Sequence, residues 1–161
     1  SACLIPSFFH ALITLRRMKH GLFLLILMLV SCITTEMAGY FIGRAIGKHK
    51  LTPSISPNKT WEGSLGGVAV SILFGLLLAG IYDSVAQSGL LYGCLCFYLL
   101  LSSVVGQFGD LAMSALKREA GIKDFGKILP GHGGILDRFD SQLFAAPFTL
   151  LFVVLFCPIV F

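Results

Sequence analysis

Long apolar runs separated by short polar segments dominate the pattern of this chain. The apolar runs cover residues 1–15, 21–40, 65–82, 90–108 and 143–161. A helix needs about 20 apolar residues to cross the hydrocarbon core of a bilayer, and most of these runs approach that length. The first run, which ends in a basic cluster, is typical of the end of a spanning helix. The pattern predicts an all-α fold, a polytopic transmembrane helical bundle.

The composition agrees with this class. Of the 161 residues, 56% are hydrophobic and only 12% are charged, whereas soluble domains carry about 25% charged residues. No repeat or soluble domain boundary is evident, so we expect one membrane-embedded catalytic domain over residues 1–161. Because the chain opens in apolar sequence without Met or a signal peptide, we interpret it as the C-terminal portion of a longer chain.

The charges and cysteines exclude several classes of site. The basic residues are clustered rather than spread into a long stripe, which favours an anionic ligand or lipid headgroup and argues against nucleic acid as a partner. All five cysteines lie in or beside apolar runs. Their spacing does not match a zinc site, and we interpret them as small buried side chains.

Two polar segments are predicted to share one face of the membrane. The loop 44–64 and the segment 114–140 are separated by two apolar runs, and the linker between those runs contains Asp83 but no Lys or Arg. The bias of Lys and Arg toward cytoplasmic loops then predicts that both segments face the cytoplasm. The basic cluster 16–20 would fall on the other face. Either this cluster is an exception to the bias, or the run 21–40 is broken or re-entrant.

Glu36 is the one carboxylate in the run 21–40. A charge within a membrane segment is costly, so we expect Glu36 to face a polar cavity near the site, the alternative being an end residue that reaches the interface. Gly39, Gly43 and Gly47 follow at intervals of four. This spacing indicates either close contact with another helix or a loop at a helix end.

The loop 44–64 combines basic residues with hydroxyls. Pro53 and Pro57 exclude a continuous helix, and Ser56, Lys59 and Thr60 place a cation and two hydroxyls in a short stretch. A solvated loop beside anionic lipid would explain the basic residues. It would explain the hydroxyl-rich sequence SPNKTWEG less readily, so we also consider a role in ligand binding.

The segment 114–140 holds five basic residues, four acids, a histidine and two Gly-rich turns. If the preceding helix continues, Asp110, Ser114 and Lys117 share one helical face. Asp137 and Asp140 stand three apart at the head of the last apolar run. Magnesium is usually held by one or two carboxylates together with substrate phosphates, so Asp110 and Asp137 are candidates to share a metal ion.

The sequence PGHGG within this segment carries hardly any side chain except His132. Glycine allows backbone N–H groups to approach an anion, although such a cluster is also typical of an ordinary turn. For His132, a structural role and a role beside a phosphate both remain open. Together these residues indicate phosphoryl or nucleotidyl transfer, which depends on positioning and charge neutralisation. Nucleophile-elbow and P-loop motifs are absent.

The spacing of these residues resembles the signature of the phosphatidate cytidylyltransferase (CDP-diglyceride synthetase) family, S-x-x-K-R-x4-K-D-x-G-x5-H-G-G-x2-D-R-x-D. Every fixed position is met, by Ser114, Lys117, Arg118, Lys123, Asp124, Gly126, His132, Gly133, Gly134, Asp137, Arg138 and Asp140. The upstream SPNKTWEG is similar to the family's S-P-x-K-T-W-E-G. One position departs from the family pattern: Glu36 stands where the usual residue is Asp.

The resemblance implies a reaction in which CTP and phosphatidic acid give CDP-diacylglycerol and pyrophosphate, dependent on Mg²⁺, with a second cation left open. It implies Asp110 and Asp137 as metal ligands, with Glu36 as a further candidate. The implied catalytic residues are Asp110, Asp137, Lys117, Arg118, Lys123, Asp124, His132, Arg138 and Asp140. The implied substrate-binding residues are Ser56, Lys59, Thr60, Ser114, Gly133 and Gly134.

Two other functions remain open at this stage. One is a related membrane CTP-dependent nucleotidyltransferase or kinase that acts on another lipid, and the other is a non-catalytic lipid-binding membrane subunit. We expect a bacterial inner membrane protein whose site faces the cytoplasm, with membrane lipid as a partner and a homodimer left open.

Overall fold

Helices make up almost all of the regular structure in the computed structural model, which describes residues 3–53, 55–87, 89, 91–122 and 139–156. Its elements, in chain order, are α1 (Leu4–Arg17), α2 (Gly21–Ile46), β1 (Lys50–Thr52), β2 (Ser56–Thr60), α3 (Trp61–Ala86), α4 (Tyr92–Glu119) and α5 (Asp140–Phe156). The all-α prediction is confirmed, with a small two-stranded hairpin as the addition.

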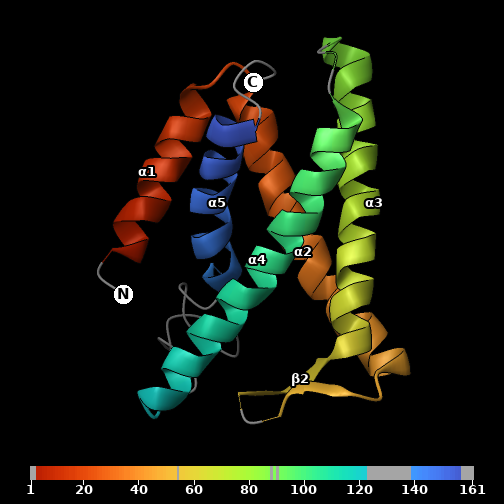
Figure 1. Ribbon diagram of the computed structural model, residues 1–161, viewed down its shortest axis with the longest axis vertical. Coiled ribbons are helices and arrows are strands. Elements are labelled where there is room, and N and C mark those ends of the chain that lie inside the picture. The colour runs from red at the N-terminus through yellow and green to blue at the C-terminus, as the bar shows by residue number, and fades with distance from the viewer. Residues whose placement is uncertain (1–2, 54, 88, 90, 123–138, 157–161) are drawn as a thin grey trace, which may run out of the picture.

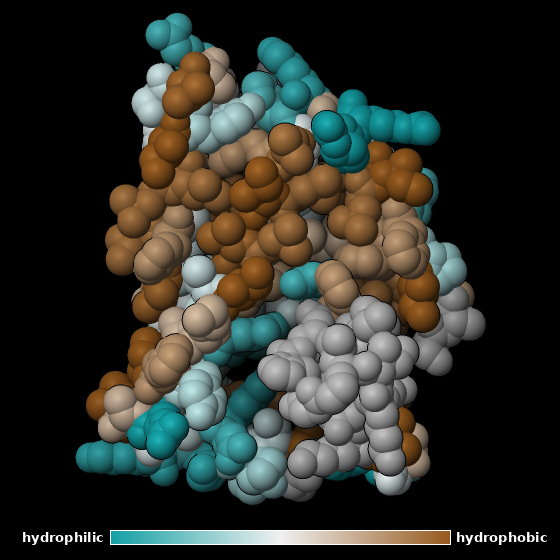
Figure 2. Space-filling view, turned by 180° about the vertical axis from the view of Figure 1, so that it is seen from behind, coloured by the Kyte–Doolittle hydropathy of each residue, from teal (hydrophilic) through white to brown (hydrophobic). Residues whose placement is uncertain are grey.

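The helices run up and down beside one another (Figure 1). Three of them, α2, α3 and α4, are long and apolar enough to cross a membrane, and α5 is a shorter apolar helix. The face shown in Figure 2 carries an apolar band between hydrophilic residues at the two ends of the molecule. This distribution fits a bundle that lies in a bilayer with its ends at the two interfaces.

The long helices extend beyond the apolar runs that predicted them. The helix α2 continues past Tyr40 to Ile46, and α4 continues past Phe108 to Glu119. Hydropathy locates the part of a helix that lies in lipid, whereas the backbone hydrogen bonds continue into the polar ends. The continuation of α4 confirms that Asp110, Ser114 and Lys117 belong to one helix.

The prolines of the loop 44–64 permit a β-hairpin. Strands β1 and β2 are antiparallel, with Lys50 opposite Thr60 and Thr52 opposite Ser56. The sequence predicted a loop without a continuous helix, and strands were not expected. Proline is compatible with the edge strand of a two-stranded sheet because its missing N–H can face away from the partner. Thr60 then caps α3, and its hydroxyl accepts a hydrogen bond from the N–H of Gly63 at 3.2 Å.

Glycine lets α2 and α3 touch through their backbones. A Cβ atom built on Gly63 would lie 2.5 Å from the carbonyl oxygen of Gly39 and 2.9 Å from the Cα of Gly43. For Gly39 and Gly43 the close-contact interpretation is therefore confirmed. Gly47 instead caps the end of α2 in an extended conformation. This contact fixes the hairpin, which connects the two helices, against the end of the bundle.

Buried hydroxyls join the helices farther from the hairpin. Ser71 of α3 donates to the Ser31 hydroxyl of α2 at 3.1 Å, and Ser103 of α4 donates to the Ser71 hydroxyl at 2.9 Å. Tyr98 of α4 and Thr149 of α5 share a hydrogen bond of 2.9 Å. Such bonds each stabilise helix association in a membrane by about 0.6 kcal/mol on average. They fix the spacing of the four helices that surround the site.

The two ends of the bundle carry different polar segments. The hairpin and the final turn of α4 lie at one end, and the turn between α1 and α2 lies at the other (Figure 1). Because α2 is one uninterrupted helix, the broken or re-entrant alternative for the run 21–40 is wrong. The basic cluster 16–20 is therefore separated from the hairpin by the length of a spanning helix.

Candidate functional site

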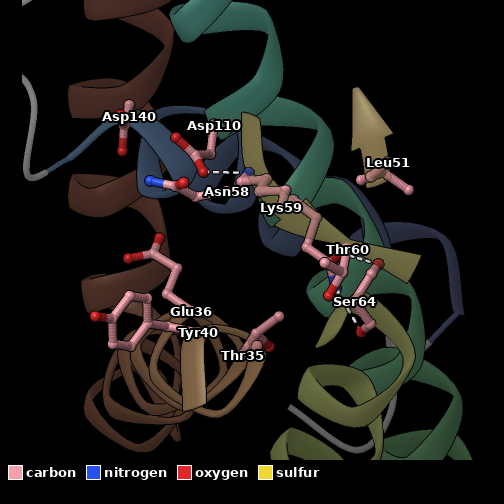
Figure 3. A pocket seen from close by; sticks show the side chains of 12 residues that line it. Thr35, Glu36, Tyr40, Leu51, Asn58, Lys59, Thr60, Ser64, Asp110 and Asp140 are labelled. Atoms are coloured by element: carbon pink, nitrogen blue, oxygen red, sulfur yellow. Dashed lines mark hydrogen bonds and ion pairs between the residues drawn. The ribbon is translucent and has the colours of Figure 1, made fainter. Parts of the chain in front are cut away.

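A polar cavity of about 250 Å³ lies where the hairpin meets the ends of the long helices. It is lined by Thr35, Glu36, Gly39, Tyr40, Leu51, Asn58, Lys59, Thr60, Ser64, Gln107, Asp110 and Asp140. Figure 3 shows the labelled side chains of α2, β2, α4 and α5 around this space. Together with Leu51 of β1 and Ser64 of α3, six separate elements therefore contribute to one site.

Three carboxylates from three helices line the cavity. Glu36 comes from α2, Asp110 from α4 and Asp140 from the first residue of α5. Like charges held this near to one cavity repel one another unless cations neutralise them. The prediction that Glu36 faces a polar cavity is confirmed. Glu36 also accepts a short hydrogen bond from the hydroxyl of Ser141, which joins α2 to the head of α5.

Two lysines neutralise part of this acidic charge. The ammonium of Lys59 forms an ion pair with Asp110 (Figure 3). The Nζ atom of Lys117 lies 3.7 Å from Oδ2 of Asp140, and these two side chains are only 11% and 10% exposed. An ion pair so well shielded from water interacts more strongly than one at the surface. The pairs bind the hairpin to α4, and α4 to α5.

The hairpin supplies a cation, an amide and a buried hydroxyl. Lys59 and Thr60 both line the cavity, as expected from the hydroxyl-rich motif, and Thr60 is 5% exposed. Asn58 also lines the cavity, and Figure 3 shows it on the same side as Asp110. Ser56, at the start of β2, is half-buried and does not line the cavity.

Sequence reasoning missed several residues of the cavity wall. Asn58 occupies a variable position within a recognised motif, and Tyr40 follows Glu36 by four residues on the same helix face. Ser64 and Gln107 hydrogen-bond one another, and the Gln107 amide also donates to the Ser64 carbonyl at 3.2 Å. The helical spacing from Glu36 could have indicated Tyr40. The Ser64–Gln107 pair links α3 to α4 and carries no local sequence pattern.

The structure describes only some of the remaining predicted site residues. Arg118 is exposed and does not line the cavity, and Ser114 is half-buried on the same helix. Seven predicted residues lie outside the described residues: Lys123, Asp124, His132, Gly133, Gly134, Asp137 and Arg138. Their roles stay predictions, including the pairing of Asp137 with Asp110.

The carboxylate and hydroxyl oxygens of the cavity are the kind of ligand that a hard cation prefers. Among the described residues no three His, Cys, Asp or Glu side chains are grouped closely enough to hold a metal ion by themselves. Magnesium, however, commonly takes only one or two protein carboxylates and completes its shell with water and substrate phosphates. The carboxylate of Asp110, accessible from the cavity, fits that smaller requirement.

Comparison with known proteins identifies the family. A family model described as the cytidylyltransferase family matches residues 1–156. The chain belongs to the cytidylyltransferase family. The resemblance found in the sequence is thereby confirmed, and the family match includes the hairpin, the long helices and the cavity described above.

Curated members of the cytidylyltransferase family show the same similarity. A phosphatidate cytidylyltransferase of Bacillus subtilis (strain 168) is 46% identical over 157 residues, which cover 97% of this chain and 57% of that protein. Another from Brucella suis biovar 1 is 49% identical over 123 residues, covering 76% and 44%. A third, from Staphylococcus epidermidis, is 47% identical over 120 residues, covering 74% and 45%. The chain spans about half the length of the curated relatives it matches.

Proposed function

We propose that this chain carries the site that transfers the cytidylyl group of CTP to phosphatidic acid, giving CDP-diacylglycerol and pyrophosphate. The observation that carries the proposal is the cavity in which the lysine of the SPNKTWEG motif pairs with the acid that precedes the family signature. Lys59 and Asp110 come from segments far apart in the chain and meet at the polar end of an apolar bundle. A substrate with a phosphate headgroup and lipid chains requires a polar site at the end of an apolar bundle.

Lys59 in the cavity wall and Lys117, which pairs with the lining residue Asp140, are suited to phosphate groups. Lys59 lies at the cavity wall within reach of any anion that enters, and the Thr60 hydroxyl lies beside it. Lys117 is held near Asp140 in a shielded position. Positive charge placed where negative charge builds up is the main source of catalysis in phosphoryl and nucleotidyl transfer. In this proposal Lys59 and Lys117 orient the phosphates of CTP and of the lipid.

The carboxylates have a different role in the proposal. Asp110, with Asp137 from the family signature, would hold Mg²⁺, and the ion would neutralise charge on the nucleotide phosphates. Asp140 and Glu36 would position neighbouring groups, because Asp140 pairs with Lys117 and Glu36 accepts from Ser141. With a metal ion held by Asp110, Lys59 would be available to the phosphates.

The transfer itself requires one bond to form and one to break. A phosphate oxygen of phosphatidic acid attacks the α-phosphorus of CTP in line with the leaving group. The bond from the α-phosphorus to the oxygen that bridges it to the β-phosphorus breaks, and pyrophosphate departs with that electron pair. Because the lipid phosphate is already ionised at neutral pH, no side chain has to remove a proton from it. The residues of the cavity therefore act by orientation and charge.

The proposed function can be tested by following pyrophosphate release. The purified protein in detergent would receive each of the four ribonucleoside triphosphates, with and without phosphatidic acid and with and without Mg²⁺. We expect release only with CTP, lipid and metal together. Release of pyrophosphate with a different lipid acceptor, such as a polyprenyl phosphate, would indicate the related lipid nucleotidyltransferase. Formation of CDP without pyrophosphate, with diacylglycerol or a polyprenol as acceptor, would indicate the related lipid kinase. Binding of lipid without turnover, by folded protein, would contradict the proposal.

We also propose that the site faces the cytoplasm of a bacterial inner membrane. The hairpin end carries Arg44, Lys48, Lys50 and Lys59, and such concentration of basic residues is typical of cytoplasmic loops. Lys48 lies beside the hairpin, and Gln87 lies at the far end of α3. Single cysteines placed at these two positions can be labelled from outside intact cells in a background free of native cysteine. Labelling of the Gln87 position alone is expected. Labelling of the Lys48 position alone would show that the site faces the opposite side of the membrane.

A further inference from the structure

A second groove lies at the end of the bundle opposite the candidate site, and the function proposed above does not use it. We call it the α2–α3 groove. Its volume is about 430 Å³, and it is lined by Arg16, Lys19, His20, Gly21, Leu22, Phe23, Ile26, Leu78, Ile81, Tyr82 and Val85. These residues come from the end of α1, the turn that follows it, the first part of α2 and the last part of α3.

The shape of the groove follows from the packing of α2 and α3. These helices touch through Gly39 and Gly63 at the hairpin end, where no side chain separates them. Figure 1 shows them diverging toward the other end. There the facing residues are large, including Ile26 and Ile81, which are 41% and 66% exposed. The divergence leaves an apolar cleft that reaches the end of the bundle.

The mouth of the groove is basic and structurally fixed. His20 hydrogen-bonds the Tyr82 hydroxyl at 2.7 Å, and Phe23 stacks on the Tyr82 ring with centroids 4.1 Å apart. These contacts tie the α1–α2 turn to α3. Arg16 and Lys19 are exposed at the rim. None of the described residues that line the groove is acidic, so its charge is complementary to an anion.

From this arrangement we propose that the α2–α3 groove binds one anionic phospholipid, in the leaflet opposite the candidate site. The lipid phosphate contacts Arg16 and Lys19, and an acyl chain lies against Leu22, Ile26 and Ile81. Cationic pockets between membrane helices are suited to anionic lipid headgroups, and an arginine or lysine near the surface contributes about a fivefold gain in affinity each. A free phosphate would leave the apolar walls without a partner.

The basic residues at this end stand out against the usual distribution of charge in a membrane protein. Basic residues are concentrated in cytoplasmic loops, yet the cluster 16–20 lies a full helix length from the hairpin. A bound anionic lipid would place a negative charge beside Arg16 and Lys19. It also bridges the α1–α2 turn to the last turns of α3, next to the His20–Tyr82 bond. The lipid is therefore expected to stabilise this end of the bundle.

Native mass spectrometry of the purified protein in mild detergent tests the proposal, with phosphatidylglycerol as the anionic probe and phosphatidylcholine as the neutral one. Neither probe is a substrate of the proposed reaction. We expect one phosphatidylglycerol to be retained in preference to phosphatidylcholine. The double variant R16Q/K19Q is expected to bind phosphatidylglycerol at least tenfold more weakly. Arg17→Gln is the matched control, because Arg17 is exposed on the same turn but does not line the groove.

A second pair of variants separates charge from apolar contact. Val85 lines the groove and is 83% exposed, so its replacement does not disturb the core. Val85→Asp is expected to abolish the preference for phosphatidylglycerol, whereas Val85→Asn retains it. Circular dichroism confirms the helical content of each variant. Equal retention of both lipids by the unmodified protein, or equal losses in Arg17→Gln and R16Q/K19Q, would overturn the proposal.

Discussion

The ammonium of Lys59 in β2 forms an ion pair with the carboxylate of Asp110 in α4. The two side chains are 29% and 22% exposed, so the pair lies at the cavity wall and remains accessible from it. The pair joins the hairpin to α4. In the proposed function, Lys59 would contact a nucleotide phosphate and Asp110 would contact a metal ion. The pair therefore links the local structure of the hairpin to the proposed chemistry.

Replacement of either member of this pair should reduce turnover. We expect Asp110→Asn and Lys59→Gln each to lower kcat/KM by about 100-fold or more, the usual loss when one electrostatic contact to a reacting group is removed. Because the two residues act on one centre, the double variant should lose much less than the product of the single losses. Steady-state release of pyrophosphate measures all three.

A matched control for these variants is Glu119→Gln at the end of α4. Glu119 is exposed and does not line the cavity, so this substitution removes a carboxylate from the same helix and leaves the site intact. Its activity should remain within twofold of the unmodified protein. Near-normal activity of Asp110→Asn would refute the proposed role of Asp110.

The sequence predicted the helices and the polar groups of the site to different extents. Apolar runs located the spanning parts of α2, α3 and α4 because the bilayer imposes a length and a polarity on each. Motif spacing identified Lys59, Asp110 and Asp140 as parts of one site, because all three occupy fixed positions of family motifs or lie beside them. Glu36 was expected at a polar cavity because an acid in an apolar run requires one.

Other features depend on contacts between distant segments. The hairpin was predicted only as a loop, since Pro53 and Pro57 exclude a continuous helix without specifying the antiparallel pairing of β1 with β2. The short bond from Ser141 to Glu36 joins residues 105 positions apart. Ser64 and Gln107 meet in the same way at a separation of 43. No local pattern marks such partners, because helix packing alone places them together.

The glycine contact between α2 and α3 should be sensitive to a single methyl group. In Gly63→Ala the new Cβ would lie 2.5 Å from the Gly39 carbonyl oxygen, so the helices must separate. Forced overpacking of this kind destabilises by about 1–3 kcal/mol. The midpoint of thermal unfolding in detergent should fall. Activity should fall with it, because the strand that carries Lys59 leads directly into α3.

Gly80→Ala provides the comparison on the same helix. A Cβ atom at Gly80 would meet nothing within 4 Å, and alanine is the better helix former. Its unfolding midpoint should be unchanged or slightly higher. Equal destabilisation by the two substitutions would show that glycine content, rather than the contact with Gly39, determines stability.

The pair between Lys117 and Asp140 should behave as a shielded ion pair. Removing one partner with Lys117→Met or Asp140→Asn leaves a buried charge, which is expected to destabilise by about 3–5 kcal/mol. The double variant should be destabilised by less than the sum of the two single losses, with a coupling energy of about 1–3 kcal/mol. Unfolding by a denaturing detergent measures the four proteins of the cycle. Strict additivity would contradict a direct interaction between the two side chains.

The Ser141 hydroxyl should position the site without taking part in the reaction. It donates to Glu36, which lines the cavity, but Ser141 itself does not line it. A hydrogen bond to a charged group contributes about 1.5–3 kcal/mol, so Ser141→Ala should lower stability by that amount. It should reduce kcat about three- to tenfold with little change in the KM for CTP, because the lysines that orient phosphate stay in place. Ser84→Ala is the control, since Ser84 bonds only the Ile81 carbonyl at the far end of α3 in the described structure. Activity of Ser141→Ala equal to that of Ser84→Ala would show that the bond to Glu36 has no part in positioning the site.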